Sequence, residues 1–351
     1  MLHYPLSTLQ PQDRMAAGSR AAVTKATFPV LQGMSLYRLS IAEGCFREPH
    51  WHPNADELGY VTKGEALVTV FSSGNRHDVF RVREGDMYLA PSGSFHSIEN
   101  VGRGNAEIVA VFSHESPEDF GLSGAVGCMS REVMANTWGV PTSALGAITR
   151  EPKDVLFAKS DAGAVEIPAI ADYANPFKYP LESMPPLIAA AGGTAKLARG
   201  DLWPALRSQS MFSLRMGRAS MREPHWHPET AELGYVLAGR ARMTVKFPGQ
   251  GPTSVETYDL APGDVYFIPK AYPHHIENLA ATSGNAESDL HFLIFFDKAV
   301  GNDIGYTGGI SAFPRRIVAP TLGTTVSALP KYPDVPEDRM VVPDARGLRQ
   351  A

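Results

Sequence analysis

The sequence predicts an all-β protein made of two tandem antiparallel β-barrels with short flanking helices. The heptapeptide Arg-Glu-Pro-His-Trp-His-Pro occurs at residues 47–53 and again at 222–228, 175 residues later in a chain of 351. An identical stretch repeated at half the chain length indicates an internal duplication. Each half also contains many short apolar-alternating segments separated by Gly, Pro, Asn and Asp, which is typical of an antiparallel barrel or sandwich.

The first half predicts its strands in a simple order. Residues 34–41 alternate apolar with mostly polar side chains, as a half-buried strand does. Residues 58–71 are expected to form a hairpin that turns at Lys63 and Gly64. Further strands are expected over residues 79–82, 87–91 and 107–112.

The second half repeats this order, and a short helix is expected after each barrel. Its predicted strands are residues 211–216, 233–247, 255–260, 265–269 and 291–296. Residues 130–136 predict a helix because Ser130 is a favourable N-cap before helix-forming residues. Residues 313–318 are the weaker counterpart in the second half.

The repeat and the proline positions predict the domain bounds. We expect an N-terminal domain over residues 1–150, whose first 20 residues form an arm over the other half or a neighbouring subunit. Residues 151–192 are expected to be a linker, and residues 193–351 a C-terminal domain with an extended tail from Pro330.

Composition argues against several classes of partner. The net charge is −5 without a basic cluster, so nucleic acid is not expected to bind. No apolar run has membrane-spanning length, and the N-terminus lacks the order of a signal peptide, so we expect a cytoplasmic protein that does not bind membranes. The two cysteines, Cys45 and Cys128, lie outside the repeated pattern and predict neither a thiolate site nor a disulfide framework.

The repeated stretch carries side chains suited to bind metal. The two histidines of each copy are two residues apart, so in an extended segment they lie on one face. A glutamate follows five residues after the second histidine, and a third histidine comes later in each half. Three imidazoles and one carboxylate suit a divalent transition metal and leave two positions open in an octahedral ion. The candidate ligands are His50, His52, Glu57 and His96, and His225, His227, Glu232 and His274.

Their spacing resembles the two motifs of the cupin superfamily. In the first half, Gly44 and Gly64 bracket the first three ligands, and Gly85, Pro91, Gly93 and Asn100 surround the fourth. The second half departs from these motifs where Ala219 and Ala271 replace glycines that shape turns. The chain also resembles the oxalate decarboxylase group of two-domain cupins. The resemblance rests on the sequence His-Trp-His-Pro, on the arginine that precedes it, and on the segment Asn-Pro-Phe-Lys at 175–178. The resemblance implies jelly-roll-type barrels.

The resemblance also implies a chemistry. It implies two Mn²⁺ ions per chain (Fe²⁺ or another divalent metal being alternatives), dioxygen as a co-reactant, and conversion of a small carboxylate, oxalate, to formate and carbon dioxide. Arg47 and Arg222 are expected to bind a substrate carboxylate, and a bulge near Pro49 would be needed to aim Arg47 inward. The family's Ser-Glu-Asn-Ser lid is absent from residues 113–120. Glu118 or Asp119 lies at about the right distance beyond the third histidine; Glu118 is the candidate general acid/base, and Glu115 is a weaker candidate.

Other functions remain open from the sequence. The second half has no glutamate in the loop at 297–303, so the first centre is the expected catalytic one. An oxalate oxidase, or another iron or manganese oxidase or dioxygenase with a different substrate, is a second hypothesis. A metal-storing or seed-storage-like protein is a third, and a sugar-phosphate isomerase fits less well. The resemblance further implies a homo-oligomer, a trimer or hexamer.

Overall fold

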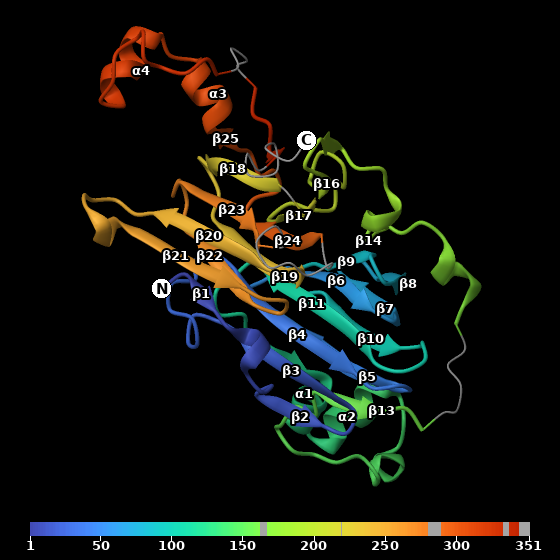
Figure 1. Cartoon of the computed structure of the whole chain (residues 1–351). Helices are drawn as coiled ribbons and strands as arrows, with labels where there is room; N and C mark the ends of the chain where they lie inside the picture. Colours follow the sequence, from blue (N-terminus) through green and yellow to red (C-terminus); the bar gives the residue numbers. More distant parts are fainter. Residues whose placement is uncertain (162–166, 219, 280–288, 333–336, 344–351) are drawn as a thin grey trace. The chain divides into compact units, whose positions relative to one another are not determined.

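The computed structural model describes residues 1–161, 167–218, 220–279, 289–332 and 337–343 (Figure 1). The chain divides into two compact units. The first unit is Gln10–Ser183, and the second unit joins Met1–Leu9 to Met184–Ala351. Ala219, which replaces a motif glycine, lies outside the described residues. None of the described helices is long and apolar enough to span a membrane.

The first unit contains two antiparallel sheets within its described residues. One sheet has the order β14-β9-β6-β11-β4-β3-β2, and the other has the order β12-β5-β10-β7-β8 with β13 also pairing β5. The strands of the first sheet are β2 (Asp13–Met15), β3 (Gly18–Val23), β4 (Ser35–Ile41), β6 (Glu57–Lys63), β9 (Met87–Ala90), β11 (Ala106–Phe112) and β14 (Lys178–Tyr179). Those of the second are β5 (Cys45–Trp51), β7 (Glu65–Ser72), β8 (Arg76–Arg83), β10 (Phe95–Asn100), β12 (Phe120–Gly121) and β13 (Phe157–Lys159).

The second unit repeats this arrangement in its described part. Its sheets have the orders β1-β22-β19-β24-β17-β16-β15 and β21-β20-β23-β18-β25, and β26 also pairs β18. The first of these contains β1 (His3–Tyr4), β15 (Ile188–Ala190), β16 (Gly193–Ala198), β17 (Ser210–Met216), β19 (Glu232–Ala238), β22 (Val265–Ile268) and β24 (Leu290–Phe296). The other contains β18 (Ser220–Trp226), β20 (Ala241–Lys246), β21 (Val255–Leu260), β23 (His274–Asn278), β25 (Ile304–Gly305) and β26 (Val341–Pro343).

In the described chain, two short α-helices follow β12 in the first unit and two follow β25 in the second. They are α1 (Leu122–Gly127) and α2 (Arg131–Trp138), and α3 (Tyr306–Ser311) and α4 (Arg315–Thr321). The helix predicted over 130–136 is confirmed by α2, whose N-cap Ser130 accepts a hydrogen bond from Val133 N–H. The described 3₁₀ helices are η1 (Leu6–Thr8), η2 (Thr142–Leu145), η3 (Ala169–Asp172), η4 (Leu181–Ser183) and η5 (Pro252–Ser254).

The strands predicted from alternation are present, but the predicted hairpin over 58–71 is wrong. β6 pairs with β9 and β11, whereas β7 pairs with β8 and β10, so the chain changes sheet at Gly64. Gly64 has a φ of +82°, and a Cβ there would lie 2.9 Å from the Asn105 carbonyl oxygen. The tight turn at Gly64 therefore connects β6 in one sheet to β7 in the sheet packed against it.

The division into units differs from the domain bounds expected from the sequence. Residues 157–159 form β13 against β5, and residues 178–179 form β14 against β9, so this part of the expected linker completes the first unit. The first residues of the expected arm belong to the second unit, where β1 pairs with β22. Strands of two or three residues, such as β1, β13 and β14, pair through backbone hydrogen bonds and need no pattern of side chains. The positions of the prolines therefore did not reveal where the two units begin and end.

The core lies between the two sheets of each unit and surrounds the histidine-bearing strands. β11 and β24 are central strands of their sheets, and their apolar side chains are almost all buried. Burying a side chain such as Phe292 or Phe295 stabilises the fold by about 2 kcal/mol each. The rigid packing around β5 and β18 fixes the directions of the polar side chains that these strands turn inward.

Candidate metal centres

The first cluster of candidate ligands is assembled from both sheets of the first unit. His50 is on β5 and His52 directly follows it, His96 is on β10 of the same sheet, and Glu57 opens β6 of the opposite sheet. All four side chains are buried, and their ligand atoms lie within 4.8 Å of one another. Alternation along β5 brings both of its histidines to one face, as the sequence predicts.

Backbone carbonyls orient the three imidazoles. The Nδ1 atoms of His50, His52 and His96 lie 2.7, 2.8 and 2.9 Å from the carbonyl oxygens of Glu48, Glu118 and Ser94. A carbonyl only accepts hydrogen bonds, so Nδ1 carries the proton and the Nε2 lone pair of each ring is free to bind a metal. This orientation is typical of histidines that bind metal through Nε2.

The second cluster repeats the first in the second unit. His225 lies on β18 and His227 follows it, His274 opens β23, and Glu232 opens β19. Their Nδ1 atoms meet the carbonyl oxygens of Glu223, Asn302 and Tyr272 at 2.7, 3.2 and 2.9 Å. The four ligand atoms again lie within 4.8 Å of one another and are buried.

The donor geometry fits a six-coordinate divalent ion. In the first centre, Glu57 Oε2 lies 3.1, 3.3 and 3.9 Å from the Nε2 atoms of His52, His96 and His50. Adjacent ligands of an octahedral ion at about 2.1 Å are about 3 Å apart, so these donors are already near such positions. In the second centre, His274 Nε2 is buried and makes no hydrogen bond among the described residues, although Glu232 Oε2 is 3.3 Å away. A buried nitrogen without a partner indicates a missing ligand.

Burial and charge together set the ionisation of the ligands. Burial would raise the pKa of Glu57, but its contacts with the rings of His52 and His96 hold the pKa well below its usual range. Burial lowers the pKa of His50 strongly, and the charge of Arg47 lowers it further. A charged carboxylate beside a neutral imidazole is the protonation state that a divalent cation requires of its ligands.

A tyrosine holds the carboxylate ligand in each centre. Tyr88 Oη donates to Glu57 Oε1 at 2.5 Å, and Tyr266 Oη donates to Glu232 Oε1 at the same distance. A Cβ at Gly59 would lie 2.0 Å from the Tyr88 ring, so only glycine leaves room for the ring beside the ligand strand. The bond occupies Oε1 and leaves Oε2 as the oxygen that faces the imidazoles.

Arg47 and Arg222 are buried beside these centres. The bulge expected near Pro49 is present, because Arg47 pairs with Ile98 while His50 pairs with His96, three residues on β5 against two on β10. The same shift between Arg222 and His225 occurs on β18. The extra residue turns the arginine to the face that carries the histidines, which strict alternation would forbid.

Each arginine contacts an aspartate, and Arg47 Nη1 also lies 3.9 Å from Glu48 Oε1. Arg47 Nη2 lies 2.5 Å from Asp119 Oδ2, and Arg222 Nη2 contacts Asp303 Oδ2. The candidate Glu118 is exposed, and only its carbonyl reaches the centre, through His52. The weaker candidate Glu115 accepts hydrogen bonds from Gly33 N–H and from Lys25, and therefore anchors a loop.

Asp303 lies beside the second centre, in contact with Arg222 and His227, and sequence reasoning missed it. The expectation that the first centre is the catalytic one rested on the absence of glutamate in the loop of the second half. A signal was present, because an aspartate followed by an apolar residue and glycine occurs in both loops, at 119–121 and 303–305. These segments form β12 and β25, which pair with the histidine strands β5 and β18.

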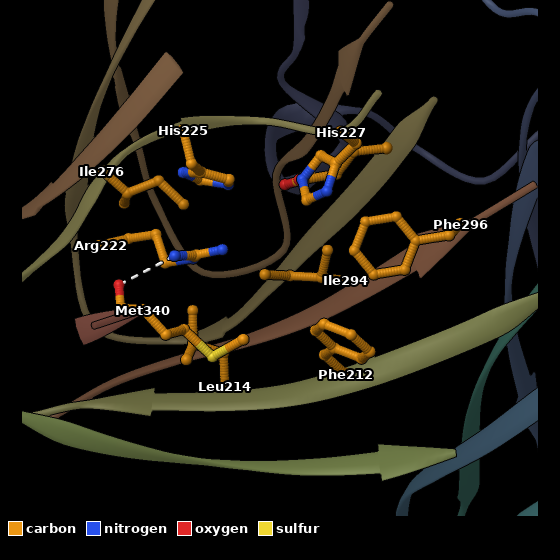
Figure 2. A pocket seen from close by; sticks show the side chains of 10 residues that line it. Phe212, Leu214, Arg222, His225, His227, Ile276, Ile294, Phe296 and Met340 are labelled. Atoms are coloured by element: carbon orange, nitrogen blue, oxygen red, sulfur yellow. Dashed lines mark hydrogen bonds and ion pairs between the residues drawn. The ribbon is translucent and has the colours of Figure 1, made fainter. Parts of the chain in front are cut away.

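Three of the four candidate ligands of the second centre line a small chamber. The chamber has a volume of about 10 Å³, which is room for about one water molecule. Figure 2 shows the Arg222 guanidinium pointing into the same chamber as the imidazoles of His225 and His227. Apart from the arginine and the metal ligands, the chamber is lined by Phe212, Leu214, Ile276, Ile294, Phe296 and Met340.

Comparisons with known proteins give one family match and several relatives that are named as oxalate enzymes. The profile of the Cupin family matches residues 6–144 and 183–326. Oxalate decarboxylase of Bacillus subtilis is 28% identical over 314 residues, which are 87% of this chain and 78% of that protein. A solved structure of that enzyme, from work on its Mn(II) centres, has a TM-score of 0.83 at 24% identity and covers 98% of this chain and 89% of its own. The oxalate oxidase GF-3.8 of Triticum aestivum is 41% identical over 88 residues, 24% of this chain and 39% of that protein.

Proposed function

The chain belongs to the cupin family, and from that premise we propose that it is a manganese-dependent enzyme that converts oxalate to formate and carbon dioxide. The observation that carries this proposal is a buried arginine beside each cluster of three histidines and one glutamate. A guanidinium in a dry site needs an anion, and its planar fork suits a carboxylate. A ligand with one carboxylate for the metal and one for the arginine fits both features.

The metal would be held by His50, His52, Glu57 and His96, and by the equivalent four residues of the second unit. When bound, manganese would supply a Lewis acid for one carboxylate and a one-electron redox partner, with dioxygen as the expected co-reactant. The Mn(II) centres named for the Bacillus subtilis relative support manganese as the metal. Nitrogen and oxygen ligands also bind later transition metals more tightly, so the metal content must be measured.

The chain's own residues would orient the substrate and manage its charge. Arg47 or Arg222 would bind the carboxylate that stays, while the carbon–carbon bond breaks and carbon dioxide leaves. The remaining carbon takes up one proton to give formate. We assign that proton to Glu118, whose backbone already contacts His52. Because the Glu118 side chain is exposed, this role requires the segment 116–119 to move when substrate binds.

The proposal is tested by oxalate turnover of protein expressed with added manganese. Formate, carbon dioxide and peroxide are followed together, and metal is measured in the same sample. Formate and carbon dioxide in equal amounts support decarboxylation. Peroxide without formate supports an oxidase, the second candidate, which the wheat oxalate oxidase relative favours. Protein with two manganese ions per chain and no product would refute oxalate as the substrate and favour another acid or metal storage.

Replacing Glu118 tests its assigned role. We expect Glu118→Gln to lower formate production by about 10²-fold or more, since general acid catalysis contributes about 10²–10⁴-fold. Glu115→Gln is the matched control, because Glu115 bonds Lys25 and Gly33 and should leave turnover nearly unchanged. Equal losses in both variants would mean that loop stability, and not proton transfer, explains the effect.

A further inference from the structure

We propose that Asp119 and Asp303 are internal counter-ions that occupy Arg47 and Arg222 until a substrate carboxylate displaces them, so that each aspartate gates its metal centre. The proposal rests on the proposed function for the identity of the substrate. It assigns a specificity role to two residues outside the set of metal ligands. It also accounts for the charge of each buried arginine, which faces an aspartate.

The first support is that each arginine is already neutralised. Arg47 is 2% exposed and Arg222 is 3% exposed, and the aspartate contact supplies the only carboxylate in hydrogen-bond contact with each guanidinium among the described residues. Their remaining hydrogen bonds go to the carbonyl oxygens of Leu156 and Met340. A buried guanidinium without an anion is strongly unfavourable, so a substrate carboxylate and the aspartate compete for one position.

The second support is that Asp119 is incompletely satisfied. Asp119 Oδ1 is buried and has no hydrogen-bond partner among the described residues. A structural ion pair normally satisfies both oxygens, because a buried polar atom without a partner costs about 1–3 kcal/mol. In the second unit, Asp303 Oδ1 lies 2.8 Å from His227 Nδ1, so Asp303 also pairs with the imidazole of a candidate metal ligand. The unsatisfied oxygen of Asp119 favours a carboxylate that can leave its arginine.

The third support is the space around Asp303. The inner chamber of about 10 Å³ cannot hold a dicarboxylate. A cleft of about 270 Å³ adjoins it and shares Phe212 and Met340 with the chamber. Asp303 lines this cleft while its carboxylate contacts Arg222 inside the chamber. Outward movement of Asp303 would therefore join the cleft to the chamber and release the guanidinium in one step.

The fourth support is that a second arginine is placed to receive each displaced carboxylate. Arg20 Nη1 lies 2.9 Å from Asp119 Oδ2, on the same oxygen that contacts Arg47. In the second unit, Arg199 lines the outer cleft with Asp303, and the Asp303 charge already acts on it. The aspartate can thus exchange one guanidinium for another and is not left unpaired.

Oxalate binding to zinc-loaded protein tests the gate without turnover, since zinc has no redox chemistry. The full chain is loaded to two zinc ions, and oxalate and acetate are titrated by calorimetry. Asp119→Asn and Asp303→Asn retain the shape and remove the charge. If the gate is closed in most molecules, each variant should bind both anions at least about tenfold more tightly at its own centre. Equal or weaker binding would overturn the proposal.

Asp78→Asn and Asp259→Asn are the matched controls. They remove carboxylates that pair with Arg76 and Arg242, which belong neither to the metal centres nor to the proposed gate. Their affinities for both anions should stay within about twofold of the parent protein. Tightening in the controls equal to that in the gate variants would mean that net charge alone explains the effect, and would also overturn the gate.

If a variant fails to fold or to bind zinc, a measurement on the parent protein tests the gate instead. Saturating acetate should speed hydrogen exchange of the backbone amides at 119–121 and 303–305, because their segments must open. Unchanged or slower exchange there would contradict the gate. Oxalate turnover is a separate assay, so anion-dependent opening without turnover would refute the proposed reaction and retain the gate for another carboxylate.

Discussion

Tyr88 and Tyr266 show how one hydroxyl can control a metal centre. Each donates to the glutamate oxygen that faces away from the imidazoles, and each ring is fully buried against a glycine. Burial and the charge of Glu57 raise the pKa of Tyr88 well above its usual range, so the hydroxyl stays a donor. The tyrosine thereby fixes one rotamer and one free oxygen of the ligand.

Tyr88→Phe should lower metal affinity at the first centre by about tenfold, within the range found for residues that orient metal ligands. It should also change the zero-field splitting in the Mn(II) electron paramagnetic resonance spectrum, because Glu57 is freed to rotate. Tyr60→Phe is the control, since Tyr60 is buried on β6, the strand of Glu57, and its hydroxyl bonds Glu182. An unchanged spectrum in Tyr88→Phe would contradict the assigned role.

His227 predicts a pH dependence for the metal-free protein. Burial would lower its pKa, but hydrogen bonds to Asp303 and Glu232 raise the pKa to about 9. A raised pKa stabilises the folded state fully below the unfolded value of about 6.5, and this stabilisation is lost as pH rises through about 9. The free energy of unfolding of chelated protein, measured with urea, should therefore fall between pH 7 and 9. Asp303→Asn should weaken this dependence.

The same proton competes with the metal. A divalent ion requires neutral His227, so the apparent affinity of the second centre should rise about tenfold per pH unit from pH 7 until about pH 9. Competition with a chelator of known affinity measures this slope. A flat profile over that interval would contradict a protonated His227 in the metal-free protein.

The turn that carries the last histidine differs between the two units. Gly93 and Ala271 occupy equivalent places, with φ values of +71° and +63°, and each N–H donates to the carbonyl of a metal-binding histidine, His52 or His227. The left-handed conformation strains alanine by about 1–2 kcal/mol. The glycine that the family motif requires is thus missing at a position where the backbone still needs it.

Ala271→Gly should stabilise the second unit by up to about 1 kcal/mol, since relief of strain exceeds the added entropy of the unfolded chain. Gly93→Ala should destabilise the first unit by about 1–2 kcal/mol. Urea denaturation of metal-free protein measures both changes. Loss of stability in Ala271→Gly would show that this turn tolerates alanine without strain.

The glutamate of the repeated heptapeptide ties later segments to the histidine strands. Glu48 accepts hydrogen bonds from Leu156 N–H and from Ser123, while Glu223 accepts them from the backbone of Arg339 and Met340 and from Thr307. These contacts bring Met340 to the chamber wall beside Arg222. The repeated heptapeptide thus carries both the histidines of each centre and the glutamate that holds later segments against the histidine strand.

The molecule as a whole leaves apolar side chains exposed on its helices. Val133 and Trp138 of α2, and Ile317 of α4, are roughly half exposed. Such groups are typical of protein–protein contact sites, which supports the predicted homo-oligomer. Light scattering should give a trimer or hexamer, and Trp138→Glu with Ile317→Glu should reduce it to smaller species. A monomeric parent protein would refute the prediction.

The duplication, both sets of metal ligands and the inward bulge at Arg47 are readable from the sequence. Each depends on local geometry, because alternation along a strand decides which side chains share a face. The same pattern occurs in both halves, which strengthens the prediction. The strands over 35–41 and 106–112 follow from the same alternation. The changes of sheet at Gly64 and, in the second unit, between β19 and β20 escaped this reasoning, since alternation is identical whether two strands pair or separate.

Only the tertiary structure decided which acids face the arginines and where the units begin and end. Asp119 and Asp303 are 72 and 81 residues from their partners, and the side chain of neighbouring Glu118 points elsewhere. Residues 1–9 join the second unit through β1, although they precede the first. Contacts between segments far apart in the sequence depend on the path of the whole folded chain, and the spacing of neighbouring residues does not reveal that path.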